Sequence, residues 1–184
     1  MTRVVLQMGV TLDGYVAGQS GEANALQPEH PDIRAWKVAS LGRVGTHIMG
    51  RVTYEQMAQH WPNATDEYAS FMNKLPKVVF SKTLAAAGWA GSRIARGDLA
   101  TELAALKGGS EGEIMVHGGA RFVQALSRLG LIDEYRLVIL PVALGDGLAM
   151  FKDLPRPLTL SLEESTAFPD GTVISVYKPI GKPA

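Results

Sequence analysis

Three segments of the sequence place glycine, hydroxyl or cationic residues directly after a short apolar run. The first is Gly50-Arg51-Val52-Thr53-Tyr54-Glu55, at the predicted start of a helix. Gly50 would let a ligand approach the backbone, Arg51 can make paired hydrogen bonds to a phosphate, and Thr53 can cap the helix or donate. The segment indicates a phosphate contact at the positive end of a helix dipole, with an ordinary glycine-led helix start as the alternative.

The second segment is Val116-His117-Gly118-Gly119-Ala120-Arg121-Phe122, which puts a glycine pair between a buried strand and a helix. Two adjacent glycines permit an unusual backbone and the close approach of a ligand. A tight turn that needs glycine for packing alone is the alternative. The spacing Gly-x-Gly-x-x-Gly is absent, which excludes a standard Rossmann domain.

The third segment, Ser81-Lys82-Thr83, follows the apolar run Val78-Val79-Phe80. Its hydroxyl groups and its lysine could hold an additional phosphate, which is the group that distinguishes NADPH from NADH. A solvated loop with a local cap would explain the same residues.

The elements that position these segments alternate between strands and helices. Helical spacing begins near Asp32, Thr53, Leu99 and Ala120, and Trp61-Pro62 ends the second of these helices. Apolar runs predict strands at 4–10, 46–49, 77–80, 93–95, 113–116 and 135–142, and a final hairpin of 158–165 with 172–178. This order predicts an α/β fold: a central mixed, mostly parallel sheet flanked by helices, with an antiparallel C-terminal hairpin, in one domain over residues 1–184.

The composition excludes several classes of function. Eighteen basic residues balance 18 acidic ones, so a net charge of zero gives no electrostatic reason to expect nucleic-acid or membrane binding. The absence of cysteine excludes disulfides, thiolate metal sites and cysteine nucleophiles, and no metal site is predicted. No signal peptide and no run of about 20 apolar residues is visible, so a cytoplasmic location is expected.

The segments, in this order, resemble the dihydrofolate reductase superfamily, in the branch similar to the reductase (RibD C-terminal) domain of bacterial riboflavin biosynthesis. The resemblance covers residues 4–178. The matching stretches are 11–17, 50–55, 78–81, 116–119, Gly130-Leu131-Ile132-Asp133-Glu134-Tyr135 and Leu140-Pro141-Val142-Ala143-Leu144-Gly145-Asp146-Gly147.

This resemblance implies that NADPH lies across the carboxyl edge of the sheet, with the loop 12–17 over the nicotinamide. By similarity, Gly50, Arg51 and Thr53 would hold phosphates, and Ser81 with Lys82 would lie near the adenosine 2′-phosphate. The pyrophosphate would follow Gly118, Gly119, Ala120, Arg121 and Phe122, with a cis peptide predicted between the two glycines.

The substrate side offers four candidates. Folate reductases carry a buried carboxylate on the first long helix, and Asp32 is the nearest equivalent here, although its position favours a role as N-cap. Asp32 and Thr11 are predicted to contact the substrate. Asp13 and His117 are the catalytic candidates. Asp13 would lie near the nicotinamide, with an ordinary Asp-Gly turn as the alternative, and His117 occupies the position where riboflavin-type reductases carry a glutamate. His117 could donate a hydrogen bond or a proton near neutral pH, or it could be structural.

The resemblance implies an NADPH-dependent oxidoreductase that reduces a small pyrimidine or pteridine heterocycle. Its specific form would be 5-amino-6-(5-phosphoribosylamino)uracil reductase of riboflavin biosynthesis. Dihydrofolate reductase activity and a non-catalytic NADPH-binding sensor or interaction protein are the alternatives. Related reductases pair, so a homodimer is expected through residues 140–148 and the final hairpin.

Overall fold

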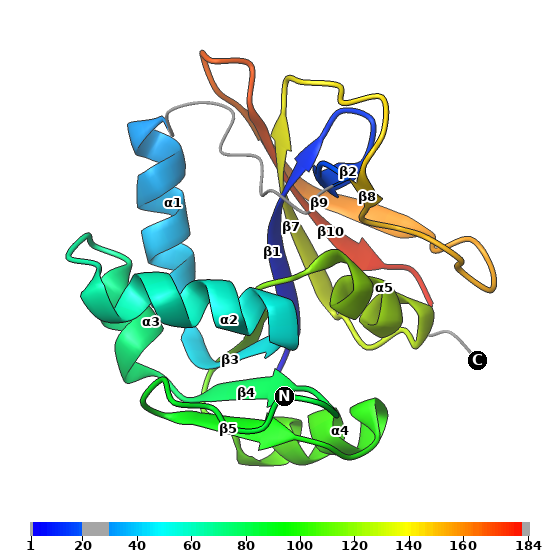
Figure 1. The fold of residues 1–184 in the computed structure, drawn as a ribbon. Coiled ribbons are helices and arrows are strands. Elements are labelled where there is room, and N and C mark those ends of the chain that lie inside the picture. Colours follow the sequence, from blue (N-terminus) through cyan, green and yellow to red (C-terminus); the bar gives the residue numbers. More distant parts are fainter. Residues whose placement is uncertain (1, 20–29, 182–184) are drawn as a thin grey trace.

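The computed structural model describes residues 2–19 and 30–181, and its main feature is an eight-stranded sheet. The strand order is β5-β4-β3-β6-β1-β7-β10-β9 (Figure 1). The bounds are β1 (Val4–Thr11), β3 (Val44–Gly50), β4 (Lys77–Phe80), β5 (Ser92–Ala95), β6 (Glu113–Val116), β7 (Glu134–Leu140), β9 (Leu160–Ala167) and β10 (Val173–Pro179).

Six of these strands, from β5 to β7 in the sheet order, are mutually parallel, and β10 runs against both of its neighbours, β7 and β9. The hairpin of β9 and β10 therefore forms the antiparallel end that the sequence predicts. The expected fold class, a mixed and mostly parallel sheet flanked by helices, is confirmed.

Helices cover both faces of the sheet. They are α1 (Pro31–Leu41), α2 (Arg51–His60), α3 (Ala69–Lys74), α4 (Leu99–Gly109) and α5 (Ala120–Arg128), and a 3-10 turn, η1 (Trp61–Asn63), follows α2. The helices α4 and α5 pack on one face, through Leu103 and Val123, in the largest cluster of buried apolar side chains. The helices α1, α2 and α3 contribute to the clusters on the other face.

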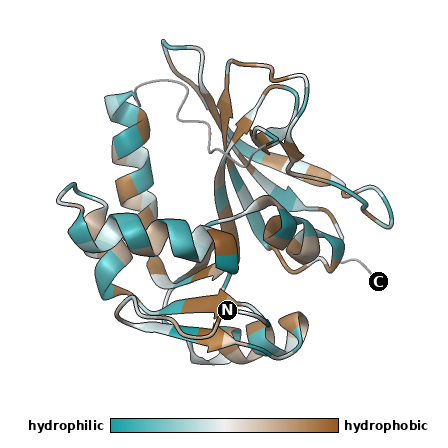
Figure 2. Ribbon diagram, in the orientation of Figure 1, coloured by the Kyte–Doolittle hydropathy of each residue, from teal (hydrophilic) through white to brown (hydrophobic). Residues whose placement is uncertain are grey.

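The period of two along the strands explains why both faces are apolar. Val78 belongs to the cluster under α4 and α5, while the next residue, Val79, belongs to the cluster under α2 and α3. Ile114 and Met115 divide between the same two clusters. A strand covered on both faces needs a continuous apolar run, and Figure 2 shows hydrophobic colour along the strands and hydrophilic colour on the outer helix surfaces.

Four short elements were not predicted from the sequence. The strands β2 (Tyr15–Ala17) and β8 (Leu148–Ala149) pair to form a separate small sheet, and α3 with η1 fills the connection between α2 and β4. Within the ranges 2–19 and 30–181, no helix has both the length and the apolar composition needed to cross a bilayer.

A buried ionic network closes the amino-terminal edge of the sheet. The guanidinium of Arg136, 3% exposed, donates to Glu134 at 2.7 Å, to Glu113 at 2.8 Å and to Ser40 at 2.7 Å. Arg3 donates to the same two carboxylates at 2.6 and 2.5 Å. Burial alone would raise the pKa of Glu113, but the hydrogen bond and charge of Arg136 outweigh it and the pKa is lowered.

Substitution of Arg136 by methionine is expected to lower the free energy of unfolding by about 3 to 5 kcal/mol, because two buried carboxylates lose their main partner. Urea unfolding followed by circular dichroism measures this change. The matched control is Lys178→Ala, which breaks an exposed pair with Glu163 and is expected to leave the midpoint nearly unchanged. Equal midpoints for Arg136→Met and the wild type would contradict the assignment of a stabilising network.

Candidate functional site

The carboxyl ends of β3, β6 and β1 meet at one edge of the sheet, and two of the predicted segments touch there. The N–H of His117 donates to the carbonyl of Ile48 at 3.0 Å, and the N–H of Gly50 donates to the carbonyl of Gly118 at 3.4 Å. The peptide bond between Gly118 and Gly119 is cis, as the family resemblance implies. The ends of two strands about 70 residues apart in the sequence thus become one continuous surface.

Side-chain atoms of neighbouring elements lie close to the Cα of each glycine at this junction. A Cβ atom on Gly118 would lie 2.4 Å from the Cε of Met8, and one on Gly119 would lie 3.1 Å from the Oγ1 of Thr53. A Cβ on Gly50 would lie 3.3 Å from the Cβ of Phe122. The φ of Gly118, +91°, also lies in the region that favours glycine.

The helices α2 and α5 both begin at this junction. Their N-cap residues are Gly50 and Gly119, and neither helix has a side-chain cap. The first N–H groups of a helix have no partner within the helix, and its dipole is positive at that end. Two such ends beside each other form a cradle suited to a pyrophosphate.

The side chains around the cradle pair locally. Arg51 donates to both carboxylate oxygens of Glu55, one turn later in α2, at 3.0 and 2.9 Å. Because both side chains are about 44% exposed, this pair is held weakly. An anion could therefore take Glu55's place at Arg51 at small cost. Arg121 is exposed at the start of α5, next to Phe122, whose ring lies 5.2 Å from that of Phe80.

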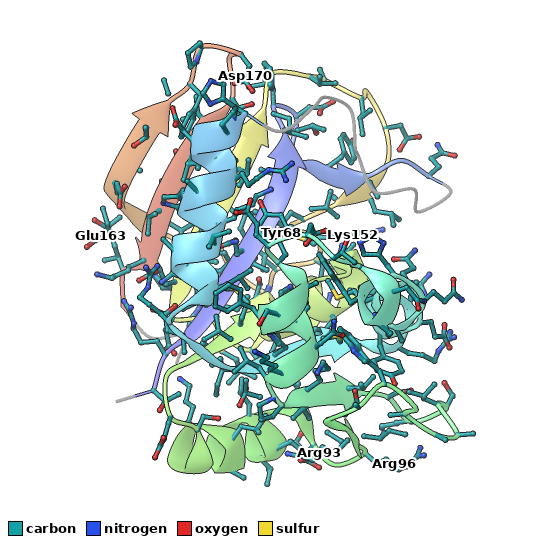
Figure 3. The ribbon with its side chains drawn as sticks, turned by 90° about the vertical axis from the view of Figure 1, so that its left-hand side faces the viewer. Tyr68, Arg93, Arg96, Lys152, Glu163 and Asp170 are labelled. Carbon is teal, nitrogen blue, oxygen red and sulfur yellow. The ribbon has the colours of Figure 1, made fainter. Side chains whose placement is uncertain are left out.

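The loop after β4 is held in place by its own Ser81 and by Arg96, the residue that follows β5. The hydroxyl of Ser81 accepts from the N–H groups of Thr83 and Leu84, at 3.2 and 2.9 Å. Arg96 donates to the carbonyls of Lys82 and Leu84, at 3.2 and 2.6 Å. Arg96 lies at the β5 edge of the molecule (Figure 3), and no local pattern of the sequence marks it as part of the site.

A cavity of about 270 Å³ lies beside His117, between the sheet and the helices α1, α2 and α3. Its walls are mainly apolar. Tyr68 lies next to α1 (Figure 3), and the guanidinium of Arg34, from α1, lies over the Tyr68 ring. The lining residues are Gln7, Met8, Gly9, Lys37, Leu41, Met57, Trp61, Tyr68, Met72, His117 and Val138.

Two histidines form a hydrogen-bonded chain at the edge of this cavity. The Nε2 of His117 lies 2.7 Å from the Nδ1 of His47, and the Nε2 of His47 lies 3.2 Å from the carbonyl oxygen of Phe71. Burial lowers the pKa of His47 to about 4. Burial, with the neighbouring His47, lowers the pKa of His117 well below its ordinary value. Both rings are therefore neutral near pH 7.

Asp13 and Thr11 are tied into the loop that follows β1. The Thr11 hydroxyl donates to Asp13 at 2.6 Å, and the other oxygen of Asp13 accepts from the N–H groups of Leu144 and Gly145 at 2.9 and 2.7 Å. These hydrogen bonds lower the pKa of Asp13. The carboxylate thus joins the loop after β1 to the loop after β7, and its proton affinity is low for a proton donor.

Asp32 lies away from the cavity, with a side chain 77% exposed. The expectation that Asp32 caps α1 is wrong: the N-cap is His30, whose ring accepts from the Asp32 N–H. Because Pro31 starts the helix, the cap falls one residue before it rather than at the acidic residue after it. The charged residue of α1 that lines the cavity is Lys37.

A family model of the RibD C-terminal domain matches residues 2–174 of the chain. The chain belongs to this family. Among its relatives is the uncharacterized protein YyaP of Bacillus subtilis (strain 168), which is 30% identical over 180 residues, 95% of this chain and 94% of YyaP. The resemblance seen in the sequence is confirmed.

Solved structures with this fold come from reductases and related proteins. A Shewanella sp. PV-4 protein provisionally assigned to riboflavin biosynthesis has a TM-score of 0.82 and 24% identity, over 98% of this chain and 100% of that one. The deaminase/5-amino-6-(5-phosphoribosylamino)uracil reductase of Thermotoga maritima has a TM-score of 0.71 and 16% identity, over 97% and 57%. Dihydrofolate reductase of Enterococcus faecalis, complexed with NADP(H), has a TM-score of 0.64 and 14% identity, over 97% of each chain.

Several residues that line this candidate site were missed in the sequence. Gln7 and Lys37 are ordinary polar residues within a strand and a helix, and nothing in their neighbours marks them. His47 lies inside an apolar run, where a histidine is read as part of a buried strand. Among the described residues, no group of three or more His, Cys, Asp or Glu side chains is arranged to hold a metal ion.

The low pKa of His47 predicts that the protein loses stability in mild acid. The unfolded chain binds a proton at His47 near pH 6.5, whereas the folded chain does so near pH 4. Between these values the unfolded state holds more protons, so the free energy of unfolding falls as the pH falls, by up to about 1.4 kcal/mol per pH unit for this group. Above pH 6.5 the stability that His47 contributes through its lowered pKa no longer changes with pH.

Urea titrations at several pH values between 4 and 7 measure this slope. The variant His47→Asn removes the titrating ring and is expected to show a shallower slope over the same range. The same slope in both proteins would show that His47 is not the group responsible.

Proposed function

We propose that the protein is an NADPH-dependent reductase of a small heterocycle, acting in the manner of the RibD reductases. The observation that carries the proposal is the meeting of two uncapped helix starts at the Gly118-Gly119 peptide, next to a cavity lined by His117. The first feature suits a dinucleotide and the second a planar substrate. Family membership supports the same reading.

The residues present fit such a cofactor. The cradle offers the backbone N–H groups of the first turns of α2 and α5, which no side chain caps. Glycine at both N-caps leaves no Cβ there, and a Cβ on either one would lie close to Phe122 or Thr53. Arg51 and Thr53 would hold phosphate oxygens, Ala120 to Phe122 would follow the pyrophosphate, and Ser81 with Lys82 would hold the 2′-phosphate. NADPH, when bound, supplies a hydride to the substrate.

The protein's own side chains would cover the reacting edge and hold the substrate. The loop of Thr11 and Asp13, fastened to residues 144–145, would cover the reacting edge and exclude water. The cavity walls, with Trp61 and Tyr68, would sandwich a planar ring. Lys37 brings a positive charge to the same cavity and suits an anionic or carbonyl-rich substrate.

The lining argues for a pyrimidine substrate rather than a folate. Folate reductases hold the pteridine with a carboxylate from the first long helix, whereas the described residues that line this cavity include no Asp or Glu, and α1 contributes Lys37. A ribosylaminopyrimidine of the kind named for the Thermotoga reductase is therefore the substrate we favour. Dihydrofolate would leave its ring nitrogens without an acidic partner.

Pairing of two copies through residues 140–148 and the β9–β10 hairpin stays part of this proposal. Leu148 and Leu162 in these segments are exposed. A second copy packed on these segments would cover both leucine side chains and so lower their exposure.

Calorimetric titration with NADPH and then NADH tests the cofactor assignment. NADPH is expected to bind the more tightly, and Lys82→Gln is expected to weaken NADPH while leaving NADH unchanged, because only NADPH carries the 2′-phosphate. Lys178→Gln is the matched control, since β10 lies at the opposite end of the sheet from β4. If neither NADPH nor NADH binds, the proposed function is refuted.

Arg51→Ala is expected to weaken NADPH binding by about 1 to 3 kcal/mol, the usual range for a hydrogen bond to a charged group. Glu55→Gln is the control, because it removes only the local partner of Arg51 and is expected to hold or raise the affinity. Fluorescence titration of the bound nicotinamide measures both. An unchanged affinity in folded Arg51→Ala protein would remove Arg51 from the site.

A further inference from the structure

The hydrogen-bond chain at His47 fixes where the protons of both histidines lie. The carbonyl oxygen of Phe71 can only accept, so the Nε2 of His47 must carry the hydrogen that joins them. His47 is neutral, and its Nδ1 therefore holds a lone pair. The hydrogen between the two rings must then come from the Nε2 of His117.

His117 is also neutral, so its second nitrogen, Nδ1, carries no hydrogen. Among the described residues, no hydrogen-bond partner of this Nδ1 is present, and the ring lines the cavity. A nitrogen in this state accepts a hydrogen bond and cannot donate one.

A second acceptor lies on the neighbouring strand. The Oε1 atom of Gln7 is buried without a hydrogen-bond partner, and Gln7 lines the same cavity. The two strands are in register, since Leu6 of β1 pairs with Val116 of β6, directly before Gln7 and His117. An unpaired buried acceptor is costly, which favours a ligand that supplies donors at this point.

We infer that His47 is a positioning residue that holds His117 in the Nε2–H tautomer, so that the cavity offers His117 Nδ1 and Gln7 Oε1 as paired acceptors to N–H groups of the substrate ring. The inference rests on the proposed function in taking this cavity as the substrate site. It assigns the substrate class as a heterocycle with at least two N–H donors, as in an aminopyrimidine. It also gives His117 a role in recognition rather than in supplying the proton.

Nitrogen-15 NMR of the unmodified protein tests the tautomer directly, without nucleotide or substrate. The chain has 4 histidines, and His117→Asn identifies the His117 signals. The expected spectrum shows a hydrogen on Nε2 and none on Nδ1 of His117, with a coupling across the hydrogen bond to Nδ1 of His47. A hydrogen on Nδ1 of His117, or on Nδ1 of His47, would overturn the inference.

Substitution at His47 tests the positioning role. His47→Leu removes the acceptor and is expected to abolish the coupling and average the His117 ring signals. His47→Asn supplies a side-chain oxygen near the position of Nδ1 and is expected to restore the Nε2–H signal. If His47→Leu leaves the His117 signals as in the wild type, His47 does not position the ring, and should this variant not fold, the spectrum of the unmodified protein still decides the tautomer.

Titration with 5,6-diaminouracil in the presence of NADP⁺ tests the paired acceptors. Binding is expected to shift the His117 Nδ1 resonance, and His47→Leu and Gln7→Met are each expected to weaken binding about threefold to tenfold, the range for one lost hydrogen bond. Lys178→Gln, an exposed exchange on β10 outside the cavity lining, is the control and is expected to leave binding unchanged. Failure of the ligand to move the Nδ1 resonance would refute the acceptor role, whereas failure of NADPH to bind would refute the proposed function alone.

Discussion

The parallel pairing of β6 with both β3 and β1 is the constraint on which the candidate site depends. Because β3 and β6 run the same way and Ile48 pairs with Val116, both strands end at one edge of the sheet, beside β1. The backbones of residues 50 and 118 are hydrogen-bonded to each other there. Gly118, which faces Met8 of β1, has a φ of +91°, a backbone conformation that favours glycine.

The two edges of the sheet treat buried polar groups differently. At the amino-terminal edge, Arg136 donates to the carboxylates of Glu134 and Glu113, of which only Glu113 Oε2 lacks a hydrogen bond. Lys77, also buried, donates to three backbone carbonyls at 2.8 to 3.0 Å, and it lies over the ring of Trp89. At the carboxyl edge, Gln7 Oε1 and His117 Nδ1 have no partner among the described residues, and both residues line the cavity. The charged groups of the first edge are thus held by protein partners, whereas the acceptors of the second lie beside a space that a ligand can fill.

The fold is shared with the Enterococcus dihydrofolate reductase, but a fold does not by itself fix the ligand. In this chain the side chains that line the cavity come from α1, β1 and the end of β6, among other elements, and include Lys37, Gln7 and His117. These side chains, rather than the sheet, give the cavity its polar character.

The sequence by itself determined the strands, the fold class and the glycine-rich segments. Runs such as 4–10 and 113–116 are mainly apolar on both faces of the strand, and a strand with that pattern is typical of a sheet that is covered on both sides. The glycine pair 118–119 likewise marks a close approach whatever packs against it. Both signals are local, and for that reason they can be found in one sequence.

Only the tertiary structure decided which polar groups meet. His47 and His117 are 70 residues apart, and the carbonyl that orients them belongs to Phe71, in the helix α3 that the sequence did not predict. Asp13 likewise has its partners at Leu144 and Gly145, and Arg96 at Lys82 and Leu84. Each pair is brought together by strand order and helix packing, so the proton positions and charges of the site depend on distances that no local pattern contains.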